Sequence, residues 1–287
     1  MHRGMMKLAV ALAISASWAV VQPARAQTFN STFFNSTTGH TETARATFSE
    51  VTGSISGTSL VAGSNLYLQI VLTNTSTFSG YQNPDLLGGL FFSIAGNTTN
   101  DLTPDLAITP KALINPNQCD STAVAICSTG PVNVGAQWGY SYSSSGTFSG
   151  PALSIVGNYG ISAPGYSAIT SPAVSHPRSF GTAPPVLVAH ASGPQVTLVG
   201  ANFTDAASSN AVAKDPLLNT SVTFLLGLPT GIGSLHVSAA TFTYGTNPDA
   251  VHGGVTATPE PASLTILGLG LTLICVARRC KGRLSPV

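Results

Sequence analysis

The residues best suited to metal chemistry are four oxygen-bearing side chains in one short segment, Asn97, Asn100, Asp101 and Asp105. Calcium takes clustered carboxylate and carbonyl oxygens, so this segment could line a calcium loop. The four residues lack the D-x-[DN]-x-[DN]-G order of a calcium-binding hand, and turn formation explains them equally well. We predict no metal site and no cofactor.

The chain lacks the sequence motifs of nucleophilic catalysis. The segment Gly53-Ser54-Ile55-Ser56-Gly57 has isoleucine where a hydrolase needs its central serine. Histidines at positions 40, 176, 190, 236 and 252 share no H-E-x-x-H spacing. We predict that the protein is not an enzyme. The alternative, a polysaccharide-processing enzyme, would need two carboxylates that converge in a cleft.

Three aromatic residues alternate along one segment and could bind sugar by ring stacking. Trp138, Tyr140 and Tyr142 would project from the same face of a strand. An exposed aromatic platform of this kind can hold a polysaccharide. The alternative interpretation is that the rings, Trp138 above all, are buried in the core.

Cys119 and Cys127 lie eight residues apart in a segment rich in turn-forming residues. In an oxidising compartment a disulfide is the natural state of such a pair. A metal site is the rival interpretation, but neither a C-x-x-C motif nor a nearby histidine supports it. We predict a Cys119–Cys127 disulfide.

The elements that would position these residues are short strands. Segments with period-two apolar patterning are separated by Gly, Pro, Asn and Ser clusters, which favours an all-β domain. The candidate strands are 43–51, 66–73, 89–95, 132–140, 153–157, 186–190, 195–200, 220–228 and 235–244. We predict a mainly β fold with one β-sandwich or jelly-roll-like exported domain over residues 27–244.

The remaining parts of that domain have less regular patterns. Residues 27–41 could form a mobile arm or the first edge strand. The Ser-, Gly- and Pro-rich interval 141–185 is expected to be loop-rich or a sheet edge. Residues 245–258 are polar and contain glycine, as expected of a flexible linker.

The charge of the central domain excludes one class of partner. Four basic residues remain once the two ends of the chain are set aside: Arg45, Lys111, Arg178 and Lys214. Nine acidic residues in the same part leave about five net negative charges. Nucleic-acid affinity depends on neutralising phosphates, so we predict no nucleic-acid partner.

The first 26 residues have the pattern of a secretory signal peptide. Arg3 and Lys7 precede an apolar stretch over 8–21, and Ala24 and Ala26 form an A-x-A cleavage site. Gln27 would then be the mature N-terminus. A permanent membrane helix is the alternative, but fourteen apolar-rich residues are few for a span. We therefore predict export through the inner membrane.

The C-terminal region has three adjoining parts. Pro259, Glu260 and Pro261 keep the backbone extended and block a helix from running upstream. The apolar run 262–277 follows, and as a transmembrane helix it would cover roughly 24 Å. Arg278, Arg279, Lys281 and Arg283 come next and would stay in the cytoplasm.

These three parts, over 259–287, together resemble the sorting tail of bacterial PEP-CTERM proteins. The resemblance implies that an exosortase recognises Pro259, Glu260 and Pro261 and processes the membrane-anchored precursor near this motif. It also implies a cell-surface or extracellular-matrix location and an association with exopolysaccharide or biofilm. The alternative is a plain C-terminally anchored periplasmic protein with a chance Pro-Glu-Pro.

The sequence therefore predicts an exported, exosortase-sorted surface protein whose β-domain is a structural or adhesive module. The expected partners are the exosortase, the inner membrane during sorting, and possible exopolysaccharide outside the cell.

Overall fold

A computed structural model describes part of the chain, and the described part is mainly β. It covers residues 26–56, 59–96, 101–109, 113–114, 132–135, 138–149, 154–163, 178–180, 197–204, 207–208, 217–230 and 235–245. The one complete helical element among these residues is a short 3-10 turn, η1 (Asn83–Asp85). The prediction of a mainly β fold is confirmed.

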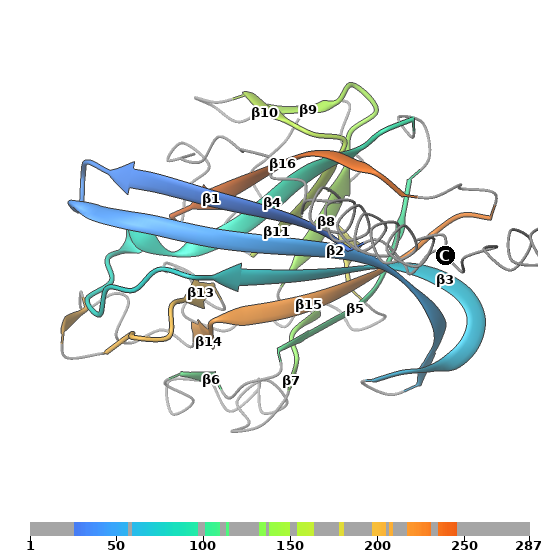
Figure 1. The fold of residues 1–287 in the computed structure, drawn as a ribbon, viewed down its shortest axis with the longest axis horizontal. Coiled ribbons are helices and arrows are strands. Elements are labelled where there is room, and N and C mark those ends of the chain that lie inside the picture. The colour runs from blue at the N-terminus through green and yellow to red at the C-terminus, as the bar shows by residue number, and fades with distance from the viewer. Residues whose placement is uncertain are drawn as a thin grey trace, which may run out of the picture.

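The first sheet has six strands, all antiparallel to their neighbours (Figure 1). Its strands in spatial order are β1 (Gln27–Asn35), β2 (His40–Ser56), β3 (Ser59–Asn74), β15 (Ser221–Gly227), β5 (Thr103–Thr109) and β7 (Val132–Asn133). The interval 27–41 therefore contributes the first edge strand, which was one of its two expected roles.

The second sheet has eight strands, and β4 (Leu87–Ile94) is its longest central member. The other strands are β12 (Arg178–Ser179), β8 (Gly139–Tyr142), β11 (Tyr159–Ser162), β13 (Leu198–Val199), β14 (Leu217–Asn219), β6 (Leu113–Ile114) and β16 (Val237–Tyr244). β13 and β14 pair in parallel, whereas the other pairs are antiparallel. A separate hairpin joins β9 (Thr147–Ser149) and β10 (Ser154–Val156).

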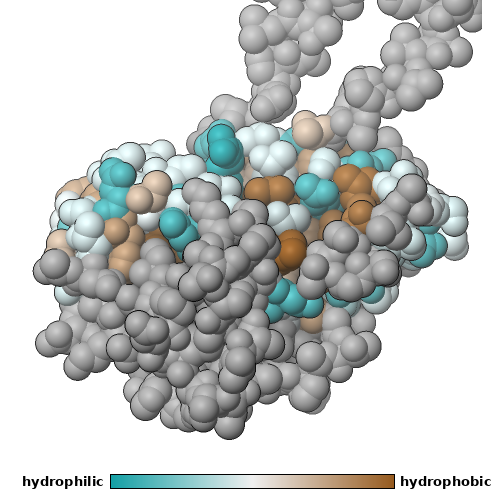
Figure 2. Space-filling view, turned by 90° about the horizontal axis from the view of Figure 1, so that it is seen from below, coloured by the Kyte–Doolittle hydropathy of each residue, from teal (hydrophilic) through white to brown (hydrophobic). Residues whose placement is uncertain are grey.

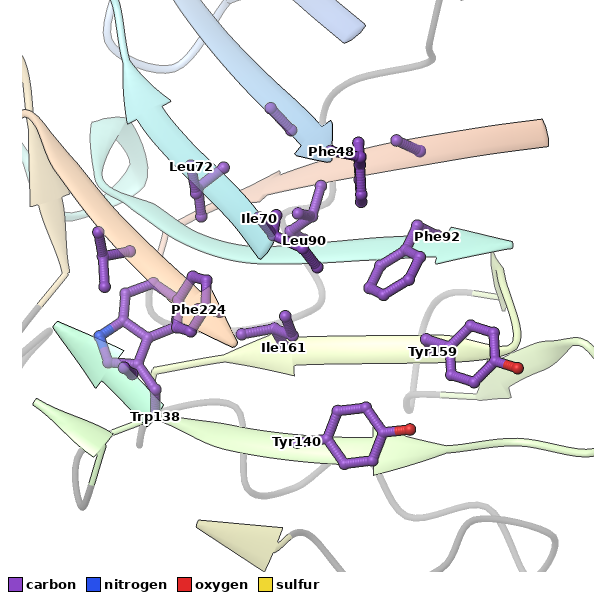
Figure 3. Packing of buried hydrophobic residues seen from close by; sticks show 14 of the residues in the cluster. Phe48, Ile70, Leu72, Leu90, Phe92, Trp138, Tyr140, Tyr159, Ile161 and Phe224 are labelled. Carbon is purple, nitrogen blue, oxygen red and sulfur yellow. The ribbon is translucent and has the colours of Figure 1, made fainter. Parts of the chain in front are cut away.

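The two sheets face each other across one hydrophobic core (Figure 3). Alternate residues of β2, β3 and β15 point inward, as the period-two pattern predicts. Rings from the two sheets meet directly: Phe48 lies 5.2 Å from Phe92, and Phe224 lies 5.1 Å from Trp138, between ring centroids. Burial of this apolar surface is the main force that holds the sheets together.

β4 is buried on both faces, which explains its nearly continuous apolar sequence. Phe92 faces the core, whereas Phe91 faces away from it and contacts Phe148 of β9 at 5.0 Å between ring centroids. Gly160 of β11 makes room for this ring, because a Cβ there would lie 2.7 Å from Phe91 Cε1. The β9–β10 hairpin thus covers the outside of the second sheet.

Several predicted strands fall within observed ones, but two patterns were misread. Residues 132–140 do not form one strand, because β7 belongs to the first sheet and β8 to the second. The interval 141–185 does contain a sheet edge, β12, as expected, but it also contains β11, which lies inside the second sheet between β4 and β8. Residues 186–190 lie outside the described residues.

The segment predicted as one strand over 220–228 changes sheets at Thr220. This residue has a φ of +65°, a left-handed conformation that is uncommon for threonine. β14 ends just before it in the second sheet, and β15 begins just after it in the first. Its N–H donates to Val199 O at 2.9 Å, and its carbonyl accepts Asn74 N–H at 2.8 Å. These bonds hold the crossing residue between the two sheets.

The long β2–β3 hairpin bends near its tip, as Figure 1 shows. The bend coincides with a register shift between Gly53 and Ser54. Gly63 is required opposite it, because a Cβ there would lie 2.8 Å from the Gly53 carbonyl carbon. Leu60, beyond the bend, packs against an outer cluster formed by Tyr67, Leu106 and Leu225.

Side-chain amides join strands of the two sheets at two places. On the edge strand β1, Gln27 Nε2 donates to Val237 O at 3.3 Å, and Gln27 Oε1 accepts Val237 N–H at 2.6 Å. At the end of β3, a central strand, Asn74 Nδ2 donates to Leu198 O at 3.0 Å, and Asn74 Oδ1 accepts Ser76 N–H at 3.0 Å. Each amide therefore acts as an extra peptide group between strands of different sheets.

The Asn74 contacts give a direct test of this link between the sheets. We expect Asn74→Ala to lower the free energy of unfolding by about 2–4 kcal/mol, because it leaves a buried carbonyl and a buried N–H without partners. Asn30→Ala, on the exposed side of β1, is the matched control and should change stability by less than about 0.5 kcal/mol. Chemical denaturation of both variants measures the difference. Equal stabilities would contradict the role of Asn74.

Candidate functional site

Many of the sequence-predicted site residues lie outside the described part of the chain. They are the sorting motif Pro259, Glu260 and Pro261, the basic residues Arg278, Arg279, Lys281 and Arg283, the cysteines Cys119 and Cys127, and the cleavage-site residue Ala24. Ala26 and Gln27 are described, and β1 begins at Gln27. The disulfide and the sorting tail stay predictions.

The proposed sugar-stacking residues share one face of β8 and its start, but that face is turned toward the core (Figure 3). Trp138 and Tyr140 are fully buried. Tyr142 is partly buried and contacts Tyr159 at 5.6 Å between ring centroids. A stacking platform needs exposed rings, so Trp138 and Tyr140 cannot form one, and the core interpretation holds for both.

Tyr140 instead supports the start of β5. Its hydroxyl donates to Asp101 Oδ1 at 2.8 Å and accepts the Leu102 N–H at 3.1 Å. Burial, followed by the nearby Asp101 charge, raises the pKa of Tyr140 and keeps the hydroxyl protonated. The aromatic stripe thus positions an acidic residue rather than a sugar.

Asp101 and Asp105 line one hollow beside the middle of β3, the start of β5 and the end of β15, with a volume of about 570 Å³. Polar side chains share its wall with the ring of Tyr67; they include Ser64, Asn65 and Thr103. Burial raises the pKa of Asp105, although a hydrogen bond from the Gly227 N–H opposes the shift. Asn97 and Asn100, the other two candidates for a calcium loop, lie outside the described residues.

A second acidic cluster lies near the start of β2, where the β1–β2 hairpin meets η1. Glu42 and Asp85 are both fully buried and lie beside each other. Asp85 accepts hydrogen bonds from Thr38 Oγ1 at 2.6 Å, Gln82 N–H at 2.8 Å and His40 Nδ1 at 3.0 Å. His40 also stacks on Phe78 at 4.3 Å between ring centroids. The cluster therefore ties the first sheet to the turn that leads into β4.

Glu42 holds a proton in this cluster. Burial, followed by the Asp85 charge among the raising causes, lifts its pKa from 4.5 to about 8, against an opposing hydrogen bond from Asn35. Asn35 Nδ2 donates to Glu42 Oε1 at 2.7 Å. The other oxygen, Oε2, is buried and receives no hydrogen bond from the described residues. Protonation at this oxygen would remove the negative charge that burial disfavours.

Sequence reasoning missed this acid pair, although one signal was present. Glu42 occupies the inward register of its strand, in step with Ala44 and Ala46. An acid at an inward position needs a partner. Its partner Asp85 comes from an Asn-Pro-Asp turn distant in sequence, which no local pattern connects to Glu42.

The described part of the chain offers few other chemical groupings. Its His, Cys, Asp and Glu residues form no group of three or more that could hold a metal ion. No helix in that part is both long and apolar enough to cross a bilayer. Over the coloured part of the face in Figure 2, hydrophobic and hydrophilic residues are intermixed. No protein-family model, curated protein or solved structure matches this chain.

The protonated Glu42 predicts a pH-dependent stability. Between pH 4.5 and about 8 the folded chain holds a proton that the unfolded chain releases, so stability falls as the pH rises through this window. Glu42→Gln keeps the shape of the side chain and replaces the carboxyl O–H donor with an amide N–H donor, but the amide does not titrate. We expect it to exceed the native chain in unfolding free energy by on the order of 4 kcal/mol at pH 9, and by little near pH 4.

The control for this experiment is Glu50→Gln, which removes the same charge from the same strand. Glu50 accepts the Leu235 N–H and has no carboxylate beside it among its described contacts. This variant should keep the pH slope of the native chain in urea unfolding measured from pH 4 to 9. A native chain whose stability does not change with pH, or a Glu42→Gln variant with the same pH dependence as the native chain, would contradict a raised pKa at Glu42.

Proposed function

We propose that this chain is an exported cell-surface or extracellular-matrix protein that an exosortase sorts. Its β-domain is a structural or adhesive module associated with exopolysaccharide, and the protein is not an enzyme. We further propose that the two facing sheets form a sandwich of the jelly-roll type.

The observation that carries this proposal is the order of elements in 259–287. An extended Pro-Glu-Pro motif would present its backbone to a membrane-embedded protease just outside the bilayer. The apolar run and basic residues behind it would hold the precursor in the membrane in one orientation. A tail of this kind would sort its protein whether or not the exported domain catalyses a reaction.

The boundaries of the β-domain support the proposal. β1 begins at Gln27, the residue after the predicted cleavage site, so removal of the signal peptide would leave every described strand intact. β16 ends at Tyr244, fourteen residues before the motif begins. A linker of that length reaches up to roughly 50 Å when extended. The module would therefore have room to stand clear of the membrane during processing.

Intact-mass spectrometry of the protein from membrane and culture fractions tests the proposal. The released form should lack residues 1–26 and everything beyond about Pro261. Pro259→Ala together with Pro261→Ala should leave the precursor uncut in the membrane, whereas Pro248→Ala, in the linker, should not. A mature mass that retains 262–287 would instead identify a plain C-terminally anchored protein.

The hollow between Asp101 and Asp105 favours a second candidate, an exported polysaccharide-processing enzyme. Glycoside hydrolysis uses two carboxyl groups with different pKa values, one protonated and one ionised. Burial raises the pKa of Asp105, whereas Asp101 accepts a hydrogen bond from the Tyr140 hydroxyl. In this candidate Asp105 would be the general acid and Asp101 the base or nucleophile.

Release of reducing ends from soluble polysaccharides separates the two candidates. An enzyme should lose activity by about 10²–10⁴-fold in Asp105→Asn and keep it in the control Asp249→Asn, in the linker. No release above the blank by the native chain would reject this second candidate.

A further inference from the structure

The outward side of the first sheet carries regular rows of mostly polar side chains. β1, β2, β3 and β15 lie side by side in Figure 1, and their residues pair in register. One cross-strand row consists of Thr28, Thr47, Val71 and Thr223. The neighbouring row consists of Asn30, Arg45, Thr73 and Ser221. We call these eight residues the threonine face.

The threonine face is a surface and not a second core. Its residues alternate with buried ones such as Phe48, Leu72 and Phe224, so they point away from the core. All eight side chains are exposed or partly exposed. Adjacent members lie about 4.8 Å apart across strands and about 6.8 Å apart along them. Thr28 and Thr47 hydrogen-bond through their hydroxyls at 3.3 Å, which holds them in fixed positions.

The charge on this face is opposite to that of the domain. The exported part carries nine acids against four bases, yet none of the eight residues is acidic and Arg45 is exposed at the centre. The described acids lie elsewhere: Glu42 and Glu50 in the inward register of β2, Asp85 on η1, and Asp101 and Asp105 at the hollow. The only ion pair among the described residues joins His40 and Asp85, and it does not involve Arg45.

We propose that the threonine face binds an acidic polysaccharide, a polymer rich in hydroxyl groups that carries carboxylates at intervals. Arg45 would pair with one carboxylate in a bidentate arrangement. The hydroxyls and amide around it, which both donate and accept, match the hydroxyls of neighbouring sugars. This inference rests on the proposed function, because it supplies the ligand class of an extracellular adhesive module.

Other partners fit the threonine face less well. A nucleic acid presents few hydroxyl groups beside its phosphates, so most hydroxyls of this face would stay unmatched. A stable protein partner usually buries aromatic anchors, and the eight residues include none. A second copy of the chain stays a distinct outcome of the test, since it would appear as a change of oligomeric state.

The test measures binding of the full chain, in a neutral detergent, to polygalacturonate and to uncharged dextran. The native chain should bind polygalacturonate and show little affinity for dextran. Arg45→Gln should weaken polygalacturonate binding by about five- to tenfold. Arg178→Gln removes the same charge from β12, at the edge of the second sheet, and should leave binding unchanged. Equal losses of binding in the two variants would show that binding depends on net charge and not on the position of Arg45, and would overturn the proposal.

A second variant tests the hydroxyls without altering charge. Thr47→Val together with Thr223→Val keeps the β-branched shape that the strands favour, so the fold should be retained. We expect a further severalfold loss of binding with an unchanged circular-dichroism spectrum. Binding that is unaffected, or dextran bound as tightly as polygalacturonate, would contradict the role of this face. Dimers that form only with an intact face would assign it to self-association instead.

The outcome is separable from that of the proposed function. Sorting without Arg45-dependent binding would reject this inference alone. Arg45-dependent binding by a chain that is never cut near Pro261 would reject exosortase sorting and leave the ligand class standing.

Discussion

The polar groups at the edges of two facing sheets must be hydrogen-bonded, and this chain meets that need with side chains that carry little charge. Gln27 and Asn74 each place a carboxamide where a strand would otherwise continue, and each bonds a backbone group of the other sheet. Near η1, burial raises the pKa of Glu42 to about 8, so this inward acid also tends to stay uncharged, and Asn35 of the neighbouring strand donates to it. Partnered amides and an acid with a raised pKa keep the cost of polar groups at the margins of the core low.

Much of the fold could be predicted because its pattern is local. The alternation in β2, β3 and β15 identified strands and the residues that share a face. Two features escaped because they depend on distant partners. Thr220 carries the chain from one sheet to the other, and only its bonds to Asn74 and Val199 explain its conformation. The apolar run of β4 is buried on both sides only because β9 supplies Phe148.

The candidate sites also divide into those marked by a local sequence pattern and those that depend on partners distant in the sequence. The tail could be proposed from the sequence alone because an extended motif, an apolar run and a basic end would act through the membrane and need no tertiary contact. For Trp138 and Tyr140, period two predicted correctly that they share a face, but it cannot say whether that face meets the core or water. The Glu42–Asp85 pair and the Asp101–Asp105 hollow each bring together different elements, so no spacing in the sequence marks them.

The hydrogen bonds between Gln27 and Val237 have a consequence for folding kinetics. They join residues 210 positions apart, so the start of the first strand is fixed only once the last strand has formed. Structures dominated by such distant contacts fold slowly, in milliseconds to seconds. β1 is the edge strand of the first sheet and carries no charged side chain, so until the distant strands have packed it is a template for pairing with other chains. Crowded synthesis should therefore favour aggregation through β1.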